Sequence, residues 1–153
     1  QILKENNYGI NEIQKVIERV EPYKGAKEFL DELRTFTQVL ILSDTYKEFG
    51  LPVMKKLGSP TLFCHELEIA ENGEITDYKL RKNGTKLETV KALQSVGFET
   101  IAAGDSYNDL GMIKASKAGF LFRSPDRIKN ENQDVQTVES YEELLEEIKR
   151  ITL

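Results

Sequence analysis

Hydrophobic residues recur at helical spacing in several stretches of the chain, and short continuous apolar runs lie between them. The stretches with helical spacing are 11–20, 25–33, 46–57, 85–96, 108–116 and the segment that begins at Ser140. The apolar runs typical of buried strands are 39–42, 100–103, 119–122 and 135–138. Helices that alternate with buried strands predict an α/β fold: a mostly parallel sheet with helices on both faces.

Residues 61–80 depart from this alternation. Two strand-like pieces, TLFCHELEI and EITDYKL, flank a turn that contains Asn72 and Gly73. An Asn-Gly pair between alternating strands is a strong hairpin signal, so a β-hairpin insertion is expected here. Residues 124–133 are polar, and we expect them to form a loop.

Composition limits the classes of protein that the chain can represent. A chain of 153 residues with 39% hydrophobic content suits a globular protein with a packed core. The net charge of −5, without a block of Lys or Arg, disfavours nucleic-acid binding. A single cysteine, Cys64, excludes an internal disulfide, and no run is apolar enough for a membrane span. We expect a cytoplasmic protein with no nucleic-acid or membrane partner; a homodimer is one candidate assembly.

The stretch IAAGDSYNDLGM, residues 101–112, contains the strongest candidate chemistry. Gly104 ends an apolar run and allows a sharp turn, and a helix that starts near Asn108 brings Asp109 back beside Asp105. Two carboxylates at one point suit Mg²⁺, which completes its coordination with water and phosphate. The alternative is structural, with Asp105 as a helix cap and Asp109 favoured by the helix dipole. The two carboxylates alone leave both interpretations open.

Two further polar positions fall at or near the ends of predicted elements. Ser43, followed by Asp44, comes directly after the apolar run 39–42, and its hydroxyl is suited to hold a phosphate oxygen. Lys86 lies just inside a predicted helix start, where a cation is unfavourable unless an anion is near. Taken separately, a helix-capping serine and a solvated surface lysine are the favoured interpretations. In this order along the chain, a hydroxyl, a lysine and an acidic pair indicate a phosphate and Mg²⁺ site.

These stretches resemble a known family. LILSD, the region of Lys86 and GDSYND are similar to motifs II, III and IV of the haloacid dehalogenase superfamily of Mg²⁺-dependent aspartyl phosphotransferases. EPYKGAKEFLDELR, VLILSDTYKEF, PTLFCHELEI and IAAGDSYND resemble its phosphoserine phosphatase branch, which can also pass phosphate to homoserine. The resemblance implies that Asp105 ligates Mg²⁺ and that Asp109 supports the metal and its waters.

The resemblance also implies roles around a phosphorylated substrate. Ser43 and Lys86 would act in catalysis by holding the phosphoryl group. Asp44 and Asn108 would contact the phosphate or the amino-acid part of the substrate. The implied partner is therefore a small phosphorylated metabolite, with phosphoserine as the expected compound.

One part of the family pattern has no counterpart here. Motif I, a strand that ends in Asp-x-Asp or Asp-x-Glu, does not occur in residues 1–40. By the resemblance, that motif carries the aspartate nucleophile, the acid for the leaving group and part of the metal site. We therefore expect an N-terminally truncated and inactive piece of a phosphatase, because loss of a nucleophile costs about 10⁶ in turnover. Residues 1–20 are expected to be a remnant of a helical cap, and residues 21–153 a core domain without its first strand.

The expected function of the intact protein is hydrolysis of phosphoserine through an aspartyl-phosphate, with transfer to homoserine as a further activity. One alternative is a noncatalytic module that keeps a Mg²⁺ and phosphate pocket. Another is a phosphatase of the same family for a different small metabolite. The coding sequence upstream of Gln1 separates the enzyme from the noncatalytic module, since an in-frame motif I supports the enzyme.

Overall fold

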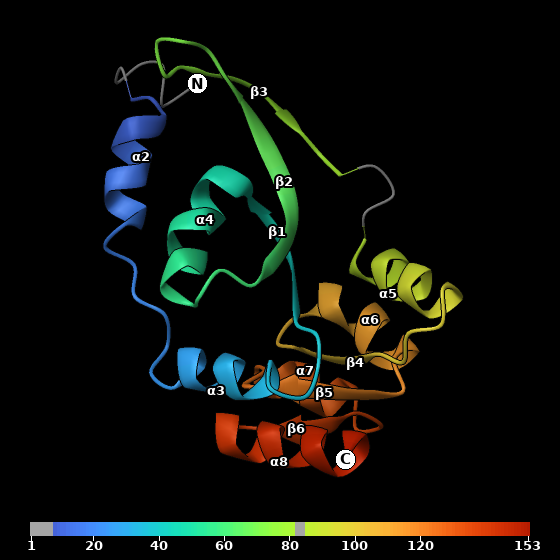
Figure 1. Ribbon diagram of the computed structural model, residues 1–153. Coiled ribbons are helices and arrows are strands. Elements are labelled where there is room, and N and C mark those ends of the chain that lie inside the picture. The colour runs from blue at the N-terminus through green and yellow to red at the C-terminus, as the bar shows by residue number, and fades with distance from the viewer. Residues whose placement is uncertain (1–7, 82–84) are drawn as a thin grey trace. The chain divides into compact units, whose positions relative to one another are not determined.

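The computed structural model describes residues 8–81 and 85–153 (Figure 1). The chain divides into two compact units, which we call unit 1 (Gln1–Lys82) and unit 2 (Asn83–Leu153), and each is described by itself. Unit 1 contains α2 (Ile10–Ile17), α3 (Ala26–Leu33), β1 (Leu40–Tyr46), α4 (Lys47–Lys56), β2 (Thr61–Ile69) and β3 (Ile75–Lys79). Unit 2 contains α5 (Lys86–Ser95), β4 (Ile101–Gly104), the 3-10 turn η1 (Tyr107–Asp109), α6 (Leu110–Ala115), β5 (Ala118–Phe122), α7 (Asp126–Glu131), β6 (Gln136–Val138) and α8 (Tyr141–Thr152).

Unit 1 is built on a three-stranded sheet in the order β1-β2-β3. β1 and β2 are parallel, and β2 and β3 form an antiparallel hairpin in which Glu66 pairs with Lys79. The turn passes through Gly73, whose φ of 86° is favourable for glycine because it lacks a Cβ. Helix α4 packs on β2, and α2 packs on α4. The hairpin predicted between residues 61 and 80 is confirmed.

Strand β1 continues past the residue where the sequence predicted its end. The prediction stopped the strand at Leu42, whereas β1 extends to Tyr46. The regular pairing with β2 does break there, because Leu42 pairs with Phe63 and Tyr46 with His65. Three residues, 43–45, therefore lie opposite one residue of β2, which is a bulge. The apolar run therefore marked only the part of β1 that pairs regularly with β2.

Unit 2 is built on a fully parallel sheet in the order β4-β5-β6. Gly104 pairs with Leu121, and Phe122 pairs with Val138. Helix α6 packs on β4 and β5, and α5 packs on α6. The most deeply buried side chains of the described residues are Phe120, Ile113, Leu121 and Val138. Leu121 and Val138 lie near the carboxyl ends of β5 and β6, and Ile113 lies in α6.

Parallel pairing of the strands is confirmed, since three of the four strand pairs in the described residues are parallel. The described strands are assigned to one three-stranded sheet in each unit. Strand pairing joins residues far apart in sequence, so hydrophobic periodicity does not determine which strands share a sheet. The predicted boundary between a cap remnant and a core at residue 20 stays a prediction.

The polar loop expected at residues 124–133 is wrong in part, because it contains helix α7. This helix has six residues and buries Ile128. A helix of this length with one buried apolar residue gives no periodic pattern to detect. The predicted helix at 108–116 begins instead with the 3-10 turn η1, and α6 follows from Leu110 to Ala115.

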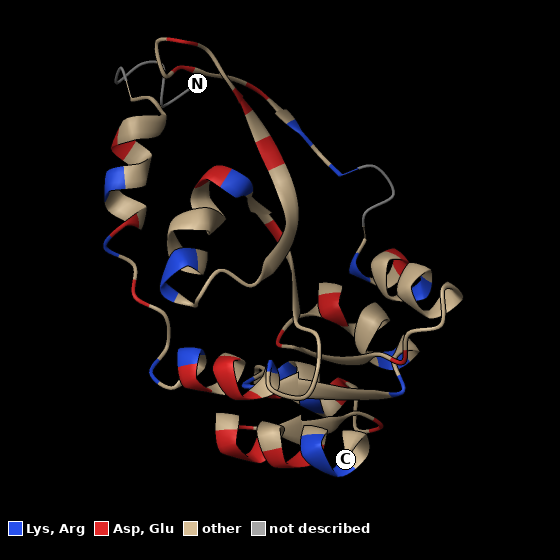
Figure 2. Ribbon diagram, viewed as in Figure 1, with Lys and Arg blue, Asp and Glu red and all other residues tan. Residues whose placement is uncertain are grey.

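The last helix, α8, has the charge distribution that its dipole favours. Its first turn carries Glu142 and Glu143, and its last turn carries Lys149 and Arg150 (Figure 2). Leu144 and Ile148 are buried on its apolar face. Within residues 8–81 and 85–153, no helix is long and apolar enough to cross a membrane.

Candidate active site

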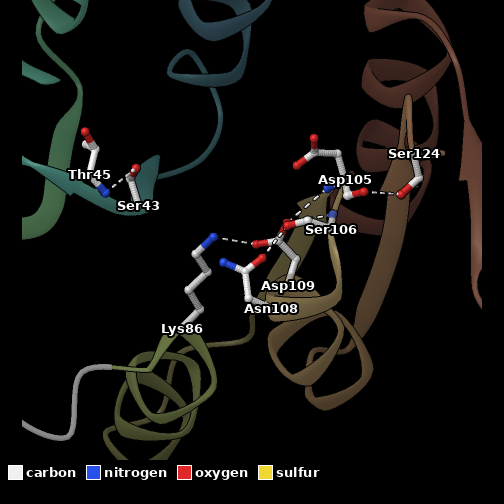
Figure 3. Close-up of polar contacts among 8 residues, drawn as sticks. All are labelled: Ser43, Thr45, Lys86, Asp105, Ser106, Asn108, Asp109 and Ser124. Carbon is white, nitrogen blue, oxygen red and sulfur yellow. Dashed lines mark hydrogen bonds and ion pairs between the residues drawn. The ribbon is translucent and has the colours of Figure 1, made fainter. Parts of the chain in front are cut away.

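The centre of the candidate site is an ion pair between Lys86 and Asp109. Lys86 Nζ lies 2.6 Å from Asp109 Oδ1, and 13% and 4% of the two side chains are exposed (Figure 3). Lys86 is the first residue of α5, and Asp109 is the last residue of η1. A cation at a helix N-terminus is disfavoured by the helix dipole, so the carboxylate of Asp109 compensates for its position. The anion that the sequence required beside Lys86 is supplied by the chain itself.

The second oxygen of Asp109 organises residues 105–109, which we call the acidic loop. Asp109 Oδ2 accepts hydrogen bonds from the backbone N–H groups of Asp105 and Ser106, each at 3.1 Å. It also accepts one from Ser106 Oγ at 2.8 Å. With Lys86 on Oδ1, both oxygens of this carboxylate are engaged within the protein. Asp109 therefore holds the backbone of the acidic loop through Oδ2 and the side chain of Lys86 through Oδ1.

The acidic loop folds back this closely because residue 104 is a glycine. A Cβ built at Gly104 would lie 2.5 Å from both Cβ and Cγ of Asp109, which is closer than real Cβ atoms approach. The lack of a side chain at the end of β4 thus admits the carboxyl group of Asp109. This agrees with the sequence prediction that Gly104 permits a sharp turn between the strand and the acidic pair.

Asp105 has a different environment from Asp109. Its side chain is exposed, and Figure 3 shows its carboxylate directed away from Asp109. Its backbone is held at both ends, because its N–H donates to Asp109 Oδ2 and its carbonyl accepts from Ser124 Oγ at 2.5 Å. The Asp109 carboxylate is therefore engaged in contacts within the protein, whereas the Asp105 carboxylate is directed outward.

The environment of Asp109 favours its charged form. Burial opposes ionisation, but the hydrogen bonds from Lys86 and Ser106 outweigh it, so the pKa of the Asp109 carboxyl lies below its ordinary value of 3.8. The Asp109 carboxyl is consequently ionised at neutral pH, and its Oδ1 contacts Lys86 Nζ. A lysine held in this way presents a fixed positive charge beside the acidic loop.

The donor set fits Mg²⁺ better than a metal that needs several protein ligands. Among the described residues, no cluster of three or more His, Cys, Asp or Glu is arranged to hold a metal ion. Mg²⁺ commonly uses one or two carboxylates and takes its other ligands from water and phosphate. Asp105 is suited to direct ligation, whereas Asp109, with both oxygens engaged, is suited to support it.

Asn108 belongs to the same loop. It lies in η1, and its Oδ1 is in close contact with Ser106 Oγ. This contact places Asn108 beside the capping interactions of the loop. Its predicted contact with substrate stays a prediction.

Ser43 and Asp44 lie in unit 1, in the bulge of β1. Ser43 Oγ accepts a hydrogen bond from the backbone N–H of Thr45 at 3.2 Å, and Asp44 is exposed. Helix α4 begins directly after this segment, at Lys47. The structure thus brings together Lys86, Asp105, Asn108 and Asp109 in unit 2. That Ser43 and Asp44 join them stays a prediction, because the two units are described separately.

Sequence reasoning gave no role to two serines that shape this site. Ser106 forms a capping box with Asp109, and the Ser-x-x-Asp spacing of residues 106–109 was a signal for it. Ser124 lies in the segment expected to be a polar loop. Its contact with Asp105 spans 19 residues and left no local signal.

Comparison with known proteins identifies the family. Residues 2–117 match the model of the haloacid dehalogenase-like hydrolases. The chain belongs to this family. The resemblance stated from the motifs is therefore confirmed, and with it membership of a hydrolase family.

Phosphoserine phosphatases are among the relatives of this haloacid dehalogenase-like chain. Phosphoserine phosphatase ThrH of Pseudomonas aeruginosa is 44% identical over 147 residues, which are 96% of this chain and 72% of that protein. A phosphoserine phosphatase of Pseudomonas syringae pv. tomato is 43% identical over 96% of this chain and 62% of its own length. The chain thus spans between about three fifths and three quarters of these two relatives.

Solved structures agree with this assignment. A phosphoserine phosphatase in its apo form superposes with a TM-score of 0.70 at 26% identity and covers 87% of this chain and 69% of that one. A phospho-aspartyl intermediate analogue of phosphoserine phosphatase gives a TM-score of 0.70 at 25% identity, over 90% of this chain and 69% of that one. The fold of this chain is that of haloacid dehalogenase-like hydrolases.

Proposed function

We propose that the protein is a Mg²⁺-dependent phosphatase that hydrolyses phosphoserine through an aspartyl-phosphate. The observation that carries the proposal is the acidic loop, which presents the Asp105 carboxylate outward and holds the Lys86 ammonium beside it. The 44% identity with a phosphoserine phosphatase over 96% of the chain supports phosphoserine as the substrate. The proposed compartment is the cytoplasm.

In this proposal each residue has a chemical task. Lys86 neutralises negative charge on the phosphoryl group as the leaving oxygen departs, and Asp109 holds the Lys86 side chain in place. Asp105, with support from Asp109, holds Mg²⁺. The metal supplies charge stabilisation for the phosphoryl oxygens. Ser43 is proposed to hold a phosphoryl oxygen, and Asp44 and Asn108 to contact the substrate.

The nucleophile belongs to motif I by the family resemblance, and residues 1–40 carry no match to it. An activity test should therefore use the chain together with any in-frame sequence that its gene encodes before Gln1. Transfer of the phosphoryl group to homoserine is part of the proposal. It is measured by adding homoserine as an acceptor and detecting phosphohomoserine.

The test is phosphate release from phosphoserine with Mg²⁺ or with a chelator. We expect activity only with Mg²⁺, and a loss of more than about 100-fold in Asp105→Asn, since residues that merely support a metal ligand already contribute 10- to 100-fold. Asp126→Asn is the matched control, because Asp126 is an aspartate of the same unit with 92% of its side chain exposed. Full activity in Asp105→Asn would contradict the metal assignment.

The same assay separates the alternatives. Mg²⁺ binding without release of phosphate from any phosphomonoester supports a noncatalytic binding module. Release from another small phosphate ester, with phosphoserine untouched, supports a phosphatase of different specificity. Both outcomes would overturn the proposed substrate.

A further inference from the structure

Ser124 is a buried serine whose hydroxyl contacts the candidate metal ligand through the backbone. Only 4% of the residue is exposed. Its Oγ donates a hydrogen bond to the carbonyl oxygen of Asp105 at 2.5 Å (Figure 3). The contact crosses from the segment after β5 to the acidic loop after β4, and the parallel pairing of Gly104 with Leu121 brings these two strand ends together.

The hydroxyl of Ser124 is not used to start the helix that follows it. Serine before a helix ordinarily caps the free N–H groups of the first turn. Here the N-cap of α7 is Pro125, and no side chain makes a capping hydrogen bond. Capping therefore does not account for a buried hydroxyl at this position, and its described hydrogen bond leads to Asp105.

The contact completes the anchoring of the Asp105 backbone. The N–H of Asp105 is held by Asp109 Oδ2 at 3.1 Å, and its carbonyl is held by Ser124. With the peptide groups on both sides of the Cα fixed, the side chain has only its own torsions left to adjust. The carboxylate is directed away from Asp109 in this arrangement (Figure 3).

We propose that Ser124 is a positioning residue that orients the Asp105 carboxylate for Mg²⁺ by holding the Asp105 carbonyl. The metal part of this inference rests on the proposed function. Loss of the hydroxyl frees one side of the Asp105 backbone, so the carboxylate samples orientations that do not bind the metal. Affinity for Mg²⁺ then falls although Asp105 itself is unchanged.

The test uses Ser124→Ala and a matched control, Ser116→Ala. Ser116 also lies in unit 2, and its Oγ donates to a backbone carbonyl, that of Met112, at 2.8 Å. It precedes β5, whereas Ser124 follows β5. Both variants thus lose one hydroxyl bound to a carbonyl, but only the hydroxyl of Ser124 is bound to the acidic loop. The variants are compared with the wild-type 153-residue chain in the absence and presence of Mg²⁺.

The first measurement needs no metal. In amide NMR spectra, we expect Ser124→Ala to shift the signals of Asp105 and Ser106 and to speed the hydrogen exchange of their N–H groups. Ser116→Ala should leave both signals in place. Unchanged Asp105 and Ser106 signals in Ser124→Ala would overturn the positioning role, whether or not the protein binds Mg²⁺.

The second measurement is a calorimetric titration with Mg²⁺ alone. We expect Ser124→Ala to weaken binding by about 10- to 100-fold, the usual effect of removing a residue that orients a metal ligand, and Ser116→Ala to bind like wild type. Ser124→Thr keeps the hydroxyl and should bind more tightly than Ser124→Ala. Equal affinity in Ser124→Ala and wild type would overturn the inference. Absence of binding in every form, including wild type, would count against the metal site of the proposed function, and the NMR result would still decide the positioning role.

Discussion

Lys86 and Asp109 form a buried ion pair that joins the start of α5 to the turn after β4. The distance from Lys86 Nζ to Asp109 Oδ1 is 2.6 Å, and the other oxygen of Asp109 accepts three hydrogen bonds from Asp105 and Ser106. One carboxylate therefore connects a helix, a lysine and the acidic loop. The geometry of the proposed phosphate site depends on this connection.

Removal of one partner of the pair should destabilise the protein strongly. Lys86→Met leaves the Asp109 charge buried without its cation, and we expect a loss of about 3 kcal/mol in the free energy of unfolding. The double variant Lys86→Met/Asp109→Asn should lose less than the sum of the two single variants. Urea unfolding of the four proteins measures this coupling.

A surface ion pair of the same unit provides the control. Lys117 and Glu99 lie 2.8 Å apart, but 47% and 75% of their side chains are exposed. Lys117→Met should change stability by less than about 1 kcal/mol, because exposed pairs contribute little. An equal loss in Lys86→Met and Lys117→Met would contradict the burial argument.

The lowered pKa of Asp109 predicts a pH dependence of stability. Its folded-state pKa lies below the ordinary value of 3.8, so ionised Asp109 stabilises the fold above that pH. This contribution is lost as the pH falls from about 4 through the folded-state pKa. The stability of the wild type relative to Asp109→Asn should be constant between about pH 5 and 7 and should decrease below pH 4. Urea unfolding of both proteins at each pH measures this relative stability. If the wild type became more stable relative to Asp109→Asn on acidification, the predicted direction of the pH dependence would be wrong.

Gly104→Ala tests the close approach of Asp109 to β4. The added Cβ would lie 2.5 Å from Asp109 Cγ, so either the strand or the acidic loop must move. We expect a loss of about 2 kcal/mol, typical of overpacking, together with altered amide signals for residues 105–109. Gly97→Ala is the comparison, because Gly97 has a φ of 95° and open space around it. The loss of stability in Gly97→Ala should come from backbone strain alone, and the amide signals of residues 105–109 should stay unchanged.

Thr85 should contribute to the stability of the helix that carries Lys86. Its Oγ1 accepts a hydrogen bond from the Glu88 N–H at 3.2 Å, so it caps the N-terminus of α5. Thr85→Ala should cost about 1 kcal/mol in thermal or urea unfolding, and Thr85→Ser should retain most of the stability. If the serine variant were as unstable as the alanine variant, the cap would not be the cause.

Much of the local structure was predictable because it depends on nearby residues. The Asn72-Gly73 turn predicted the hairpin, and apolar periodicity located the long helices and the strands. The sequence GDSYND also indicated the chemistry of the acidic loop, since Gly104 and Asp109 lie close together in the chain. Helix α7 escaped this approach, because six residues with a single buried apolar side chain carry no periodic signal.

The sequence by itself determined the residue types of the site: a lysine at a helix start and two carboxylates after a strand that ends in glycine. Only the tertiary structure decided which of these carboxylates is bound within the protein and which is directed outward. The pairing of β4 with β5 and the packing of α5 on α6 bring Lys86 and Ser124 to the acidic loop from 23 and 19 residues away. Asp109 thereby becomes an internal partner of Lys86, while Asp105 is anchored by its backbone and directs its carboxylate outward. Such contacts follow from packing between distant segments, which no local pattern encodes.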